Sequence, residues 1–146
     1  MIAWVALIGL AATLISASIC APYYLSDEGN SFFKGFVTWE LLSFLGVVVT
    51  ITLASAANLH LELNKLEECT DEGFSEARIA VKQSAYSLLI LFVAAFVLVM
   101  VKPTLVGLHW NAAVNSVAIL IVLFNLAILA DLTMGVFRIP AGVGKK

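Results

Sequence analysis

The stretch SLLILFVAAFVLVMV at residues 87–101 decides the fold class of this chain. It contains no charged side chain, and its apolar residues follow one another without the alternation of a membrane β-strand. The uncharged run extends from residue 83 to residue 101. A helix needs about 20 apolar residues to cross roughly 30 Å of hydrocarbon. This run therefore predicts a membrane-spanning helix.

Three more stretches free of Asp, Glu, Lys and Arg lie at residues 1–26, 41–61 and 103–130. Helices are expected in all of them, because a helix satisfies every backbone polar group within one segment. The predicted fold class is all-α: a polytopic membrane protein, one domain over 1–146, with a cytoplasmic helical hairpin extending spans two and three. The spans are predicted near 2–21, 36–58, 83–101 and 111–134, and the hairpin near 59–82.

Composition agrees with this class. The chain has 146 residues, of which 62% are hydrophobic and 12% are charged, and its mean hydropathy is +1.03. Soluble domains have about 25% charged residues, so the excess apolar surface is expected to face lipid. The net charge is −2, and no basic patch indicates nucleic-acid binding.

The first stretch is predicted to be a span rather than a signal peptide. Residues 1–26 contain no Lys or Arg, whereas a signal peptide begins with a basic region. Ile19 precedes Cys20, where a lipoprotein signal requires a small residue. Cys20 and Cys69 are predicted on opposite sides of the membrane, so no disulfide between them is expected.

The distribution of basic residues predicts the orientation. Both termini and residues 59–82 share one side, which carries six Lys and Arg residues, whereas the other side carries Lys34 and Lys102. The first side is therefore predicted to be cytoplasmic, in a membrane of the bacterial inner-membrane type. The six residues are Lys65, Arg78, Lys82, Arg138, Lys145 and Lys146.

The predicted hairpin is acidic. Residues 57–68 (ANLHLELNKLEE) and 75–87 (SEARIAVKQSAYS) contain no Gly or Pro, so both are expected to be helical. We interpret the carboxylates of this hairpin as a solvent-exposed face. If several copies of the chain formed a ring, the same carboxylates would attract cations. A basic protein partner could also dock on them. They are Glu62, Glu67, Glu68, Asp71, Glu72 and Glu76.

Two acids lie at the edges of spans, and either could bind a proton or cation or could be a structural anchor. Glu40 is expected at the depth of Lys102, which is its possible ion-pair partner. Asp131 is expected near Lys82 and Arg138, which are its possible partners.

Amides mark one face of the last span. Asn111, Asn115 and Asn125 fall near a single helical stripe. They could form hydrogen bonds between helices, or they could line a wet path through the membrane.

Small side chains recur on the first two spans. Gly9, Thr13 and Ala17 follow one another at helical spacing, and Gly46 is similar in span two. Such residues let helices approach closely, so contacts with other helices or other copies of the chain are expected.

No motif indicates an enzyme, a cofactor or a metal site. His60 and His109 lack further ligands at metal-binding spacing, and no nucleophile motif or phosphate-binding loop is present. The size and the four-span outline are similar to those of small drug–proton antiporters, although their essential acid in the first span is absent here. The outline also resembles that of phage holins, by composition alone.

The functional hypothesis is a non-enzymatic, homo-oligomeric channel or pore-forming protein. The alternative is a structural or accessory subunit that docks on a larger membrane complex through its hairpin. A third, less favoured hypothesis is a small proton-coupled transporter that uses Glu40. The expected partners are membrane lipid and either further copies of the chain or other membrane proteins, with no nucleic acid.

Overall fold

The computed structural model describes residues 2–69 and 75–138, and the side chains of residues 7–65 and 76–134. Within these ranges the chain is helical, as the sequence predicts. The elements are α1 (Ile2–Cys20), α2 (Pro22–Leu25), α3 (Ser31–Phe36), α4 (Trp39–Cys69), α5 (Ser75–Val101), the 3-10 turn η1 (Lys102–Thr104) and α6 (Leu108–Arg138).

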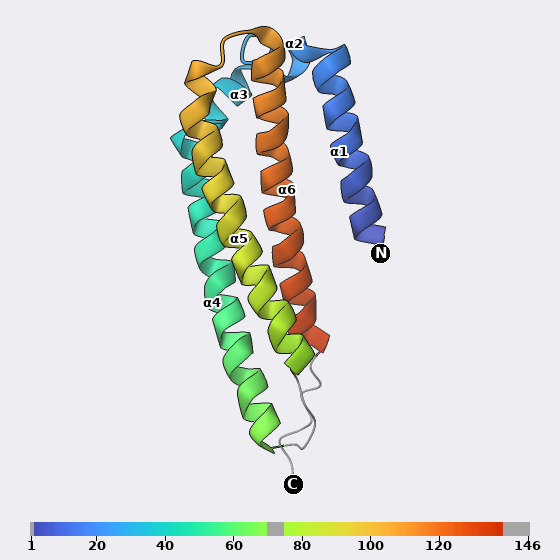
Figure 1. Cartoon of the computed structure of the whole chain (residues 1–146), viewed down its shortest axis with the longest axis vertical. Coiled ribbons are helices and arrows are strands. Elements are labelled where there is room, and N and C mark those ends of the chain that lie inside the picture. Colours follow the sequence, from blue (N-terminus) through green and yellow to red (C-terminus); the bar gives the residue numbers. More distant parts are fainter. Residues whose placement is uncertain (1, 70–74, 139–146) are drawn as a thin grey trace.

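The long helices α4, α5 and α6 lie side by side and alternate in direction, while α1 packs against the flank of α6 (Figure 1). The short helices α2 and α3 lie at one end of this bundle, next to η1. We call this the loop end. The first helix in the sequence therefore contacts the last one.

Three helices are long and apolar enough to cross a membrane: Trp39–Lys65, Glu76–Thr104 and Leu108–Met134. The predictions of spans two, three and four are confirmed to that extent. In α1 the apolar segment among the residues searched is Leu7–Cys20, which is shorter than a span. A fourth span stays a prediction, although the whole of α1 would measure about 28 Å.

The core forms along one face of α4. Leu41, Leu45 and Val49 are buried, as are Ala56 and Leu59 further along the helix. Spacings of three, four and seven residues place these side chains on one stripe, which packs on α5 and α6. By contrast, α5 exposes much of its apolar surface, with Ile90 at 68% and Met100 at 64%. That surface is suited to lipid.

The connection between the first two predicted spans, residues 22–35, contains the two short helices α2 and α3. Pro22 begins α2, where its missing N–H costs nothing. Asn30 caps α3 by accepting a hydrogen bond from the backbone N–H of Phe32, at 3.0 Å. Phe36 ends α3, so α4 begins at Trp39 rather than at the predicted residue 36.

A tight turn between these two short helices requires glycine at position 29. The Ser26 hydroxyl donates to the Tyr23 carbonyl at 2.9 Å and accepts from the Gly29 N–H at 3.2 Å. A Cβ atom on Gly29 would lie 1.9 Å from the carbonyl oxygen of Tyr23. No side chain fits there without a shift of the backbone.

The turn between α5 and α6 contains Pro103, which cannot continue a helix. The helix ends at Val101, and Pro103 lies in η1. Gly107 has φ +131°, a conformation that favours glycine, and it directly precedes α6. Helix α6 therefore begins at Leu108, three residues before the predicted boundary.

Helices α4 and α5 continue into the predicted hairpin, whose closing turn at 70–74 lies outside the described residues. Arg78 Nη1 donates to Asn64 Oδ1 at 3.0 Å and so links the two helices. We call residues 59–65 and 76–82 the α4–α5 extension.

Candidate functional site

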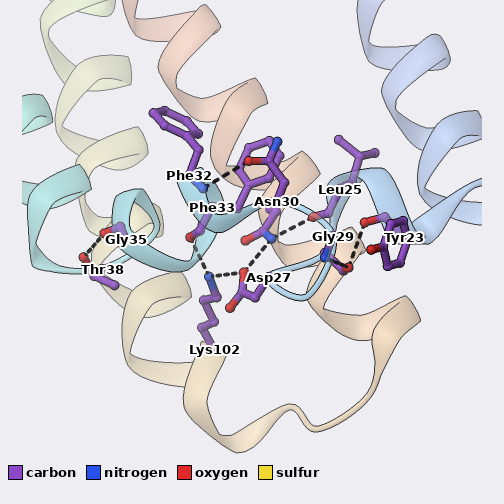
Figure 2. A network of polar contacts seen from close by, with 12 residues as sticks. Tyr23, Leu25, Asp27, Gly29, Asn30, Phe32, Phe33, Gly35, Thr38 and Lys102 are labelled. Atoms are coloured by element: carbon purple, nitrogen blue, oxygen red, sulfur yellow. Dashed lines mark hydrogen bonds and ion pairs between the residues drawn. The ribbon is translucent and has the colours of Figure 1, made fainter.

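A buried lysine organises the loop end of the bundle (Figure 2). Lys102 Nζ donates to Asp27 Oδ1 at 2.9 Å and to the carbonyl oxygen of Phe33 at 3.1 Å. The Lys102 side chain is only 10% exposed and that of Asp27 is 23% exposed. The ammonium group thus connects η1 to the α2–α3 connection (residues 26–30), through Asp27, and to α3, through Phe33.

Asn115 on α6 completes this polar network. Its side-chain Nδ2 donates to the Leu25 carbonyl at 2.7 Å and to Asp27 Oδ1 at 2.9 Å. Asn115 is fully buried, so these bonds are shielded from water. Asp27 therefore receives donors from both η1 and α6, which fixes the α2–α3 connection over the ends of the long helices.

Lys102 pairs with Asp27 and not with Glu40, which the sequence had suggested as a possible partner. Glu40 is exposed in the first turn of α4, where the helix dipole favours a carboxylate. Asp27 occupies the site beside Lys102 because the α2–α3 connection folds over η1. In the sequence, this site was indicated by Lys102 itself, because a buried cation at the end of an apolar segment needs a nearby hydrogen-bond acceptor.

Asp131 is exposed and forms no ion pair with Lys82. The Lys82 ammonium instead lies 6.0 Å from the centre of the Tyr86 ring, one turn along the same helix. The side chain of Arg138 lies outside the described residues. Asp131 lines a cavity of about 590 Å³ between α1, α5 and α6, together with polar side chains of α5. These are Gln83, Ser84 and Ser87.

The amide stripe of α6 points mainly into the bundle. Asn125, like Asn115, is fully buried, and its Nδ2 donates to the Ile121 carbonyl of its own helix at 2.8 Å. The side-chain oxygens of Asn115 and Asn125 have no hydrogen-bond partner among the described residues. Asn111 is half-buried at the start of the helix. Two buried acceptors on α6 are thus left unsatisfied.

The small residues divide into two groups. Gly9 and Thr13 are exposed on α1, whereas Ala17 is half-buried. Gly46 is half-buried on α4, and a Cβ atom there would lie 3.9 Å from Phe92 of α5. Gly46 therefore belongs to a contact within the chain, whereas Gly9 and Thr13 face outward.

The carboxylates of the predicted hairpin whose side chains are described are exposed to solvent. Glu62 pairs with Lys65 at 3.0 Å, both side chains being more than half exposed, and Glu76 is also exposed. The side chains of Glu67 and Glu68, and all of Asp71 and Glu72, lie outside the described residues. Among the described residues, no group of His, Cys, Asp and Glu could hold a metal ion.

A second cavity, of about 450 Å³, lies beside the Lys102 network. Lys34 and Lys102 both line it, with Asp27 as the carboxylate. The lining thus carries one more positive than negative charge, which suits an anion.

No family model, no curated protein and no solved structure matches this chain. The roles of its residues therefore rest on the contacts described above.

Proposed function

We propose that this protein is a non-enzymatic subunit of a membrane assembly, and that it binds its partner through the α4–α5 extension. The observation that supports this is the exposure of Leu61 and Ile79, at 57% and 65%, in the α4–α5 extension. Exposed apolar patches outside lipid are typical of protein-binding surfaces.

The length of the helices supports a position of this surface at or beyond the edge of the hydrocarbon. The span segment of α4 has 27 residues and that of α5 has 29. At 1.5 Å per residue they measure about 40 Å, against roughly 30 Å of hydrocarbon. About 10 Å thus remains for the interface and the water beyond it.

The extension has the rigidity and the charge that docking requires. The hydrogen bond from Arg78 to Asn64 joins the two helices, so little order need be gained on binding. The carboxylates of Glu62 and Glu76 are exposed beside Leu61 and Ile79. The partner we propose is therefore a membrane protein with an apolar patch bordered by basic residues.

A homo-oligomeric channel is the second candidate. The observation that favours it is the pair of unsatisfied acceptors, Asn115 Oδ1 and Asn125 Oδ1, which lie about 15 Å apart along α6. Both amides are fully buried within one protomer. A path that uses them would run through the protomer rather than between copies.

The experiment is the native mass of the complex after gentle extraction from its source membrane. We expect a species that contains other chains, and we expect Leu61→Glu and Ile79→Glu to release the 15.6 kDa chain from it. Ile19→Glu is the matched control, because Ile19 is 68% exposed on α1, away from the extension. The control should leave the complex intact.

The contrary outcome would be a species of at least four copies of this chain alone, with ion flux after reconstitution. Loss of that flux in Asn125→Leu would then support the channel. Unchanged complexes in both extension variants would remove the extension as the docking surface.

A further inference from the structure

One hydrogen-bond donor of Lys102, at the cavity of the loop end, is unused. A lysine ammonium has three N–H donors, and Lys102 gives one to Asp27 and one to the Phe33 carbonyl. The third N–H has no acceptor among the described residues, and Lys102 lines the cavity. A buried cation is thus held in place with one bond unmade.

Lys34 supplies the second positive charge. It extends from the last turn of α3, is exposed, and forms no ion pair with any described residue. Asp27 neutralises Lys102, so Lys34 leaves the cavity with a net charge of +1. Two ammonium groups around one cavity can bind separate oxygens of a phosphate group.

The aromatic residues around this cavity are typical of the depth of lipid headgroups. Trp39 lines the cavity and is 70% exposed, and Trp110 is 61% exposed in the first turns of α6. Tyr23 and Tyr24, also at the loop end, are 57% and 74% exposed. Tyr and Trp concentrate at the membrane–water interface, where phospholipid phosphates lie.

The remaining wall of the cavity is apolar. Val99 of α5 and Leu105 and Val106 after η1 line it. Within one turn of Val99, α5 also exposes Val97 and Met100. An acyl chain attached to a phosphate in the cavity could lie along this surface, which a free phosphate ion would not use.

We propose that this cavity binds the phosphate of an anionic phospholipid, with Lys34 and Lys102 as the cationic ligands and the exposed face of α5 receiving the acyl chains. The net positive charge of the lining favours an anionic headgroup over a zwitterionic one. The site is independent of the α4–α5 extension.

The test is native mass spectrometry of the full chain in detergent, titrated with phosphatidylglycerol or phosphatidylcholine. We expect preferential retention of phosphatidylglycerol, weakened about fivefold in Lys34→Gln, the effect of one basic residue near an anionic surface. Lys65→Gln is the control, because Lys65 is an exposed lysine far from the cavity. It should bind like the wild type.

A second measurement locates the lipid. Brominated phosphatidylglycerol should quench a component of the tryptophan emission that Trp39→Phe abolishes. Equal binding of the two lipids, or wild-type binding by Lys34→Gln, would overturn the proposal. Displacement of phosphatidylglycerol by millimolar inorganic phosphate would assign the site to free phosphate and would equally overturn the lipid assignment.

Discussion

Lys102 Nζ and Asp27 Oδ1 lie 2.9 Å apart and join positions separated by 75 residues. This pair closes the loop end of the bundle, because Asp27 also receives Asn115 of α6. Pairs that are largely removed from water are sensitive to the loss of one partner, since the remaining charge is then unpaired. The fold should thus depend on this contact more than on any exposed pair.

Removing the Lys102 charge is the first prediction. Lys102→Gln should lower the free energy of unfolding by about 2–3 kcal/mol, because Asp27 loses its cation in a poorly solvated site. Titration of the detergent-solubilised protein with dodecyl sulfate, followed by tryptophan fluorescence, measures this loss. Adding Asp27→Asn to Lys102→Gln should restore part of it.

The matched control is Lys65→Gln, which breaks the exposed pair with Glu62. That variant should change the free energy of unfolding by less than about 1 kcal/mol. Equal effects of Lys65→Gln and Lys102→Gln would mean that the buried pair does not hold the loop end.

Gly29 provides the second prediction. Gly29→Ala places a Cβ atom against the Tyr23 carbonyl, which is backbone and cannot move aside freely. We expect a loss of about 1–3 kcal/mol, the usual effect of overpacking. In contrast, Gly35→Ala should be tolerated, since nothing lies within 4 Å of its Cβ position. Thermal melting of both variants in one detergent gives the comparison, and a reversed order would contradict the turn geometry.

The two buried amides of α6 should respond differently to substitution by leucine. Asn115→Leu removes two bonds to the α2–α3 connection, and we expect a loss of about 1–3 kcal/mol. Asn125→Leu removes one bond within α6 and also the unsatisfied oxygen, so its effect should stay within about 1 kcal/mol. Dodecyl sulfate titration distinguishes them. A severe loss in Asn125→Leu would reveal a partner for that amide.

The orientation is tested by cysteine labelling in a background that carries Cys20→Ser and Cys69→Ser. Glu28→Cys and Glu62→Cys place exposed thiols at opposite ends of the bundle. A membrane-impermeant maleimide added outside intact cells should label position 28 and not position 62. The opposite pattern would invert the predicted topology.

The long helices were predictable because an uncharged segment of this length satisfies its backbone hydrogen bonds in lipid by forming a helix. Their boundaries were less so. Val37 and Thr38 separate α3 from α4, although residues 36–58 read as one apolar segment. Short helices such as α2 and α3 are positioned by tertiary contacts, here Asp27 with Lys102, and not by local propensity.

The partner of Lys102 could not be predicted from the expected depth of the residues in the membrane alone. An antiparallel pair of spans does bring Glu40 and Lys102 to the same end of the bundle. The direction in which each side chain points depends on helix packing, which sequence spacing does not determine. The same reason applies to Asn125. Its position on the amide stripe of α6 could be predicted from the sequence, but its burial within one protomer depends on helix packing and could not.

The packing of α1 on α6 has a consequence for synthesis. Helix α1 leaves the ribosome before α6, and Leu108, where α6 begins, lies 88 positions after Cys20. At about 5–20 residues per second, α6 follows roughly 4 to 18 s later. During that interval α1 lacks the helix against which it packs in the finished fold. The order of the elements therefore leaves this face of α1 uncovered for seconds during synthesis.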